Sequence, residues 1–178
     1  MAETDFYTVT VPPMMKTLTA LSGILDKAVS HAEGKQLEWH PKGLQEEALL
    51  SSRLISDQFP FLRQVQVACD NAKGGAARIA GIEAPKFEDN EKTIAELKQR
   101  IDKTVAFLKT IKPEQIAGQE EREVTLPHWN KKMKASAYVM TYLIPNFYFH
   151  VATAYSILRS NGVQLGKADY IGPMPFID

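Results

Sequence analysis

The amino-acid sequence predicts an all-α protein: a four-helix bundle with a long crossover after the second helix and a small β-hairpin before the fourth. Two observations carry this prediction. Apolar residues recur every three or four positions in four separate segments of the 178-residue chain, and residues 81 to 91 form the one long connection between these segments. The first pattern is the period of one helix face, and the second is compatible with bundle packing. We therefore expect a single helical-bundle domain over residues 1–178.

The first helix is expected from Pro12-Pro13 to Gly34, because proline suits the first turn of a helix and glycine suits its end. Residues 34 to 43 are typical of a loop, and residues 45 to 50 of a short helical turn. The core-facing stripe of the helix comprises Met14, Leu18, Leu21, Leu25, Ala28, Val29 and Ala32.

The second helix is expected to begin at the Ser-Asp pair 56–57, a good capping pair, with Pro60 in its first turn, and to end near Gly81. The Gly-Gly pair 74–75 costs about 1 kcal/mol per residue relative to alanine. It therefore indicates that another backbone packs closely there. The predicted apolar stripe is Phe59, Leu62, Val65, Cys69, Ala72, Ala76 and Ile79.

A third helix is expected from a cap at Asn90 to the Lys-Pro pair 112–113, where the proline stops it. The alternating stretches 123–127 and 131–135, with a turn at 128–130, are typical of a small hairpin. The stripe of the third helix is Ile94, Leu97, Ile101, Val105, Leu108 and Ile111.

The fourth helix is expected from Ser136 to Ser160, with the Asn-Gly pair 161–162 as its exit. Pro145 lies inside it and removes one backbone donor, so the helix should kink near its middle. The tail 163–178 ends in apolar residues, and we expect it to lie against the bundle surface.

Charge and composition bear on the possible partners. Lys plus Arg and Asp plus Glu balance at 21 each, so there is no broad positive field to hold a nucleic acid. The single cysteine, Cys69, excludes an intramolecular disulfide, and the opening MAETDFYTVTV lacks a basic leader and an apolar signal core. We therefore expect a cytoplasmic protein. Polar residues break the longest apolar stretches before the roughly 20 residues of a membrane span, so no integral membrane protein is expected.

Polar side chains interrupt the apolar face of the fourth helix. Asn146, His150 and Thr153 lie on it, and each would cost roughly 1–3 kcal/mol if left unpaired, so they need partners. The second helix offers Gln66 and Asp70, four residues apart. The whole face comprises Val139, Tyr142, Leu143, Asn146, His150, Thr153 and Ile157.

Two interpretations of these residues remain open. If the second and fourth helices face each other, the Asp70 carboxylate orients the His150 ring and raises its pKa, which gives a general base or a ligand. The same side chains equally fit a buried hydrogen-bond network that sets the helix register. Structural networks are the more frequent of the two in bundle cores.

Other residues carry weaker signals. His31, His40 and His128 fall at a helix end or in loops, where exposure to solvent is usual. Cys69 lies on an apolar stripe, as a small core residue does. The run Phe147–Phe149 covers most of a helical turn, so at least one ring leaves the core side for a pocket or a subunit interface. Phosphate-binding loops, nucleophile elbows, paired-cysteine metal sites and His-x-x-x-His pairs are absent from the sequence.

Three segments carry a resemblance to a known family: FYTVTVPPMMKTLTALSGILDKA near the start, RLISDQFPFLRQVQVACDNAKGGAARIAG at 53 to 81, and PNFYFHVATAYSILRSNGVQLGKADYIG at 145 to 172. They resemble the DinB-like superfamily, in the branch called domain of unknown function nineteen ninety-three. The resemblance spans nearly the whole chain. It implies a DinB-like four-helix bundle with a long crossover after helix two, often assembled as a homodimer.

The resemblance also bears on a metal. Some members of the superfamily are metal-dependent thiol transferases or isomerases that hold a divalent metal through three histidines, one on the second helix and a His-x-x-x-His pair on the fourth. This sequence departs from that pattern. Its second helix has no histidine, and the positions four before and four after His150 are Asn146 and Ala154. We therefore assign no metal ligands, and no cofactor is expected.

Three functional hypotheses follow. The first is a small-molecule pocket between helices two and four, with His150 as acid or base and Asp70 orienting it. The second is a non-catalytic dimeric scaffold or stress-related interaction protein, with an aromatic residue of 147–149 buried between subunits. The third is a divalent-metal-dependent thiol transferase or isomerase with a degenerate metal site. The lining residues of the predicted pocket, besides His150 and Asp70, are Gln66, Tyr142, Asn146 and Thr153.

Overall fold

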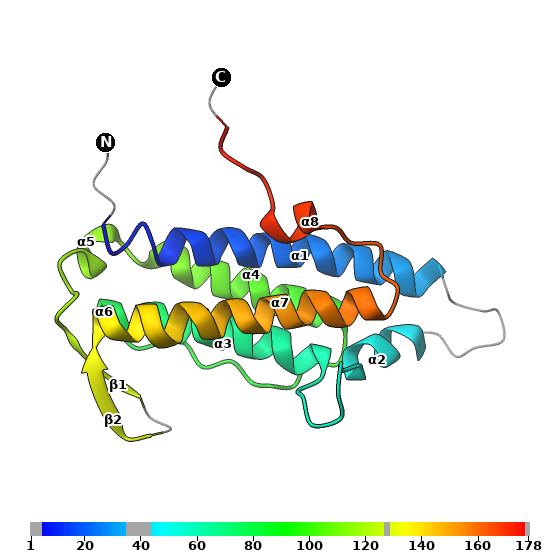
Figure 1. Cartoon of the computed structure of the whole chain (residues 1–178), viewed down its shortest axis with the longest axis horizontal. Helices are drawn as coiled ribbons and strands as arrows, with labels where there is room; N and C mark the ends of the chain where they lie inside the picture. Colours follow the sequence, from blue (N-terminus) through cyan, green and yellow to red (C-terminus); the bar gives the residue numbers. More distant parts are fainter. Residues whose placement is uncertain (1–4, 35–43, 127–128, 177–178) are drawn as a thin grey trace.

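Four long helical segments lie side by side in a bundle in the computed structural model, which describes residues 5–34, 44–126 and 129–176 (Figure 1). Two of them, the first and the last, run in one direction, and the other two run in the opposite direction. The all-α prediction is thereby confirmed. The four segments are α1 (Val11–Gly34), α3 (Phe61–Ala80), α4 (Ile94–Thr110) and the continuous run of α6 (Ala135–Tyr138), the π-helix η1 (Val139–Leu143) and α7 (Ile144–Ser160).

Shorter elements connect and cover the bundle. The predicted hairpin is confirmed as an antiparallel pair in which Val124 lies opposite Met133. It stands at the end of the bundle where α6 begins (Figure 1). The shorter elements are α2 (Leu44–Ser51), α5 (Pro113–Ile116), β1 (Glu123–Leu126), β2 (Lys131–Lys134) and α8 (Lys167–Ile171).

The helices α3 and α4 are parallel neighbours, so the chain must travel back along the bundle between them (Figure 1). Residues 81–93 make this crossover, as predicted. α3 also packs against α7, and α1 packs against α4 and α7. The long helices therefore surround one apolar core, in which the predicted stripes of α1 and α4 are largely buried.

The beginning of α3 differs from the prediction. The Ser-Asp pair 56–57 does not cap it, because the helix begins only at Phe61 and Pro60 occupies the N-cap position with an extended backbone. The amide of Phe61 donates to the carbonyl oxygen of Ser52 at 2.8 Å instead. Proline disfavours a helical conformation in the residue before it, which ends the helix on that side. The predicted exit is confirmed: Gly81 has a φ of 70°, a value that glycine adopts readily.

The cap of α4 is Thr93, and the prediction of Asn90 is wrong. The Thr93 hydroxyl accepts from the amide of Glu96 at 3.1 Å, and the Glu96 carboxylate accepts from the amide of Thr93 at 3.1 Å. This reciprocal pair is a capping box. Two donors of the first turn are thereby satisfied, which Asn90 could not do from within the crossover.

The last helix departs from regular geometry before Pro145, where a disturbance was predicted. Five residues, Val139–Leu143, form the π-helical turn η1. Because Pro145 has no N–H, one backbone hydrogen bond of the turn before it cannot form, and a local π-turn is one way to accommodate the loss. The turn brings Leu143, which is fully buried, against α3.

Close packing at the Gly-Gly pair is confirmed, but the contacting group is a side chain and not a backbone. A Cβ atom at Gly75 would lie 2.6 Å from Cδ2 of Leu143, whereas one at Gly74 would meet only the Arg78 guanidinium at 3.2 Å. Gly75 is buried and Arg78 is half-buried. Glycine at position 75 therefore lets η1 approach α3.

The chain end lies against the bundle only in part. Val163 and Leu165 are buried, and α8 packs on α1. Over residues 173–176 the prediction is wrong, since Met174 is 50% exposed and Phe176 is 85% exposed, and residues 177–178 lie outside the described part of the chain. Within the described ranges, no helix combines the length and apolar character that crossing a membrane requires.

We expect Gly75→Ala to destabilise the fold by about 1–3 kcal/mol, because the added methyl group overpacks the contact with Leu143. Gly74→Ala is the matched control. Its methyl meets a flexible arginine, so the gain in helix propensity should leave stability unchanged or raised by up to about 1 kcal/mol. Urea unfolding of both variants measures the difference. Equal effects of the two substitutions would contradict the assignment of the close contact to position 75.

Candidate functional site

The helix α3 carries polar side chains on two different faces. Gln64 and Asn71 are seven residues apart and hydrogen-bond to α7. Gln66 and Asp70 lie on the face that meets α4 and the crossover, where their partners are Glu91 and Arg100. A helix turns about 100° per residue, so Gln66 lies about 200° from Gln64 around the axis. The predicted pocket residues are thus divided between two sites.

The first site is a polar seam between α3 and α7, formed by Gln64, Asn71, Asn146 and His150. Nδ1 of His150 lies 2.7 Å from Oε1 of Gln64. Gln64 is 1% exposed, and its Nε2 donates to the carbonyl oxygen of Phe59 at 2.9 Å. Because a carbonyl oxygen only accepts, this bond orients the amide with Nε2 toward Phe59 and Oε1 toward the imidazole.

This orientation determines the tautomer of His150. An amide oxygen accepts hydrogen bonds, so Nδ1 must carry the proton that Gln64 receives. In the neutral ring the lone pair is then on Nε2. Among the described residues, none hydrogen-bonds to Nε2. The seam therefore holds an imidazole acceptor whose direction is set by the backbone through Gln64.

The surroundings of His150 keep it neutral. Burial, and after it the positive charge of Arg63, lower the pKa of His150 below its ordinary value of 6.5. The ring is 7% exposed. Phe149 packs edge-on against it at a centroid distance of 5.2 Å and is itself exposed, and Phe59, also exposed, lies beside Arg63. One accessible phenylalanine ring, that of Phe149, thus packs against a neutral acceptor.

A second amide pair extends the seam. Nδ2 of Asn146 donates to Oδ1 of Asn71 at 3.0 Å. Nδ2 of Asn71 is buried and has no hydrogen-bond partner within the described part of the chain. A buried donor without a partner costs about 1–3 kcal/mol, so this amide is a group that an added acceptor would stabilise.

The prediction that Asp70 orients His150 is wrong. The carboxylate of Asp70 instead accepts from Arg100 at 2.8 Å and from Lys73 at 3.0 Å. The predicted rise in the His150 pKa is wrong for the same reason, because its neighbour on α3 is the neutral amide of Gln64. Gln66 is likewise turned away and donates to Glu91 at 2.8 Å.

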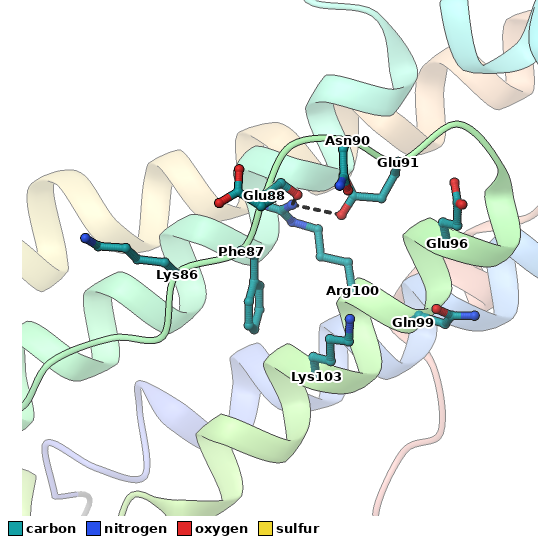
Figure 2. Close-up of a pocket in the computed structure, with 9 residues that line it drawn as sticks. All are labelled: Lys86, Phe87, Glu88, Asn90, Glu91, Glu96, Gln99, Arg100 and Lys103. Carbon is teal, nitrogen blue, oxygen red and sulfur yellow. Dashed lines mark hydrogen bonds and ion pairs between the residues drawn. The ribbon is translucent and has the colours of Figure 1, made fainter.

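The second site is the Arg100 cluster, formed by Arg100, Asp70, Asp89 and Glu91. Arg100 is 2% exposed and makes a 2.8 Å ion pair with each of the three carboxylates. Its Nη1 also donates to the carbonyl oxygen of Glu88 at 3.1 Å (Figure 2). Asp70 belongs to α3, Arg100 to α4, and the other members to the crossover. One side chain thus joins three elements.

Protonation in this cluster follows from its pairing. Burial alone would raise the pKa of Glu91, but hydrogen bonds from Arg100 and Gln66 outweigh it and hold that pKa below 4.5. Burial would lower the pKa of Arg100, and the bond to Glu91 with the charges of Asp70 and Glu91 raises it instead. Glu91 and Arg100 are therefore both charged at neutral pH.

A cavity of about 360 Å³ opens beside the cluster, between the crossover and α4 (Figure 2). The Phe87 ring lies at its edge, 4.9 Å from Nζ of Lys73 and 5.7 Å from the Arg100 guanidinium carbon. The lining carries both signs of charge, and the Arg100 charge is already neutralised. The lining residues are Lys86, Phe87, Glu88, Asn90, Glu91, Glu96, Gln99, Arg100 and Lys103.

The other predicted lining residues lie apart from His150. Tyr142 is half-buried and packs edge-on against Trp129 of the hairpin at 5.3 Å and beside Tyr138 at 5.8 Å. Thr153 is buried, one turn beyond His150 on α7. Of the predicted site residues, only Asn146 and His150 therefore belong to the seam.

The remaining candidates are structural or lie outside the described residues. Cys69 is fully buried, and burial raises the pKa of its thiol to about 12, which makes it unreactive. His31 lies in the last turn of α1. His40 and His128 fall outside the described residues.

The metal site implied by the resemblance does not fit the residues of this chain. In place of two further histidines, the seam presents amides, with Asn146 on α7 and Gln64 and Asn71 on α3. Across residues 5–34, 44–126 and 129–176, no three His, Cys, Asp or Glu side chains gather in a way that could hold a metal ion. We derive no step through a metal.

Five residues of these sites were not found from the sequence: Gln64, Asn71, Asp89, Glu91 and Arg100. The first two are seven apart on α3, a spacing that matches one helix face, and this signal was available. The position of Arg100 on the buried stripe of α4, three after Leu97, was also visible, but its three acidic partners are spread over α3 and the crossover. Their convergence depends on the crossover path.

Comparisons with known proteins agree on the family. The sequence profile of the family described as "Domain of unknown function (DUF1993)" matches residues 6–171. The crystal structure of a DinB family member protein from Shewanella denitrificans is 42% identical, with a TM-score of 0.87, and the match covers 97% of this chain and 94% of that one. No curated protein matches the chain.

The tautomer argument predicts how His150 responds to substitution of Gln64. In the unchanged chain, NMR of labelled histidine should show a proton on Nδ1 and a pKa below 6.5. Gln64→Glu should raise the pKa, because a carboxylate stabilises the imidazolium. Gln64→Ala should move the proton toward Nε2, because the acceptor is lost. A spectrum in which neither variant alters the His150 signals would show that Gln64 does not set the tautomer of His150.

The Arg100 cluster predicts an acid-dependent loss of stability. Because the folded-state pKa of Glu91 lies below its ordinary 4.5, its stabilisation is fully present above that pH and is lost as the pH falls through the folded-state value. Glu91→Gln should cost about 1–3 kcal/mol at pH 7 and flatten the decline in unfolding free energy below about pH 4.5. Glu88→Gln, with an exposed side chain, is the control. Urea unfolding of both variants over a range of pH values measures this difference. If the unfolding free energy of the two variants depends on pH in the same way, Glu91 does not contribute the predicted stabilisation.

Proposed function

The chain belongs to the DinB-like family of DUF1993 proteins, whose description assigns no activity, and we propose from its own geometry that it binds a small molecule at the α3–α7 seam. In this proposal, Nε2 of His150 accepts a hydrogen bond from the ligand. The observation that carries it is the relay from the Phe59 carbonyl through Gln64 to the imidazole, with bonds of 2.9 and 2.7 Å. The relay holds one acceptor in a fixed direction on a side chain that is 7% exposed.

The chemistry of the seam defines the ligand class. A lone pair on Nε2 recognises a hydroxyl, thiol or N–H donor. The Phe149 ring, 55% exposed, packs against His150 and offers an apolar surface beside it. Phe59, 53% exposed, is joined to the seam through the bond between its carbonyl oxygen and Gln64. The buried Nδ2 of Asn71 offers a donor. A small apolar or aromatic compound that carries a hydrogen-bond donor matches these groups.

The same geometry favours binding over proton transfer. A general base becomes an imidazolium, and an aspartate on Nδ1 would stabilise that cation. Here a neutral amide occupies that place, and both burial and the charge of Arg63 disfavour the cation. If the ligand is also a substrate, His150 acts as the base and Gln64 is its positioning residue. The reaction then proceeds through a weak base.

The test is a ligand screen by NMR with histidine-labelled protein. The probes are phenol, benzyl alcohol and benzyl thiol, each paired with its methyl ether or thioether, which lacks the donor. We expect saturable shifts of the His150 signals with each donor, and about tenfold weaker binding of each methylated partner, which corresponds to one hydrogen bond.

Two variants control this screen. His150→Phe keeps an aromatic ring and removes the acceptor, so it should abolish the difference between the paired probes. His31→Phe alters a histidine of α1 and should leave it unchanged. The proposal would be overturned if the donor probes and their methylated partners shifted the His150 signals equally, or if none of the probes shifted these signals.

A further inference from the structure

A groove of about 560 Å³ lies where the first turns of α1 meet α7 and α8. Tyr148 lines it from α7 and comes two positions before His150, so about 200° of helix rotation separate it from the α3–α7 seam. Neither the seam nor the Arg100 cluster contributes a residue to its lining. The groove is therefore a site of its own, and its walls include Pro12, Pro13, Tyr148 and Tyr170.

Thr17, which also lines this groove, carries a hydroxyl without a partner. The residue is 8% exposed, and its hydroxyl makes no hydrogen bond within the described part of the chain. Thr19 on the same helix shows the usual arrangement, in which the hydroxyl donates to the carbonyl oxygen four residues back, here that of Met15 at 2.9 Å. A nearly buried hydroxyl that lacks this bond is left for a group that enters the groove.

Lys16 is the charged residue of the lining. Its Nζ lies 3.6 Å from Sδ of Met174, in the segment that follows α8. A thioether is a weak acceptor, and no carboxylate within the described ranges forms an ion pair with Lys16. The groove thus holds a positive charge that no neighbouring negative group balances.

We propose that this groove binds a small monocarboxylic acid with an aromatic or aliphatic body. In the complex, the carboxylate replaces the Met174 thioether beside Lys16 and accepts a hydrogen bond from Thr17, because an ammonium and a hydroxyl both donate to it. The two proline rings have no N–H, and with the tyrosine rings they offer apolar surface to the body of the acid. One cation balances one carboxylate, which favours this class over a phosphate ester with nearly two charges.

Tyr170 adds a neutral donor to the same groove. Burial, and after it the charge of Tyr148, raise the pKa of the Tyr170 phenol above its ordinary value of 10.0. The phenol therefore keeps its proton at neutral pH, and it makes no hydrogen bond to another described residue. Its ring packs edge-on against Tyr155 of α7 at a centroid distance of 5.8 Å, which holds α8 beside α7. A protonated phenol can donate to the carboxylate and does not repel it.

Calorimetry with the full chain is the first test. The probes are 3-phenylpropionate, its uncharged methyl ester, and acetate, which lacks the apolar body. We expect one saturable site for 3-phenylpropionate and at least about tenfold weaker binding of the other two probes, because each lacks one of the two interactions. Equal affinity for the acid and its ester, or no saturable binding of the acid, would overturn the proposal.

Three variants locate the binding. Lys16→Met keeps an unbranched side chain and removes the charge, so it should reduce the affinity for the acid to that for the ester. Lys109→Met, at an exposed lysine of α4, is the matched control and should change neither affinity. His150→Phe should also leave the affinity for the acid unchanged, which separates this result from that of the seam. Loss of binding in His150→Phe, or full binding in Lys16→Met, would contradict the proposed site.

Thr17→Val replaces the unpaired hydroxyl by a methyl group of similar shape. Because this hydroxyl has no partner in the free chain, the free energy of unfolding should stay the same or rise, whereas 3-phenylpropionate should bind about fivefold to tenfold more weakly. Thr19→Val, at an exposed hydroxyl bonded to Met15, is the control and should leave the affinity unchanged. Equal affinities of the two variants for the acid would show that Thr17 does not contact the carboxylate.

Discussion

The rest of the structure depends on a buried guanidinium. Arg100 lies almost fully inside the protein, where an unpaired charge would cost several kcal/mol. It is tolerated because Asp70 reaches it from α3 while Asp89 and Glu91 reach it from the crossover. The parallel arrangement of α3 and α4 needs a long connection, and the cluster is what holds that connection to both helices. Removing any member leaves the others unbalanced.

This cluster also decides which side chains of α3 remain for the seam. Asp70 and Gln66 are engaged toward α4, and the described hydrogen bonds between side chains of α3 and α7 come from the neutral amides Gln64 and Asn71. An imidazole beside a neutral amide stays neutral and accepts hydrogen bonds. In the proposed function, the neutral partners of Asn146 and His150 on α3 therefore favour recognition over proton transfer.

The seam also depends on backbone geometry that holds α7 against α3. The absence of a side chain at Gly75 leaves room for Leu143, which lies in the π-helical turn before Pro145 and packs against α3 at this position. Beyond the turn, Asn146 and His150 follow at helical spacing and meet their partners on α3. A glycine, a proline, one amide pair and one pair of an amide with an imidazole thus form one continuous contact along the two helices.

The order of helices, the crossover and the hairpin could be predicted from the linear chain, because apolar periodicity, glycine and proline act through local backbone preferences. The polar stripe of α7 was visible in the same way, and Asn146 and His150 do lie in the seam. Their partners could not be found by spacing alone. Gln66 and Asp70, four residues apart, share one helix face, and Gln64 and Asn71, seven apart, share another. Only the rotation of α3 about its axis decides which of these two pairs meets α7. That rotation is set by Arg100 on one side and by the contact of Gly75 with Leu143 on the other, and both are contacts between residues distant in the chain.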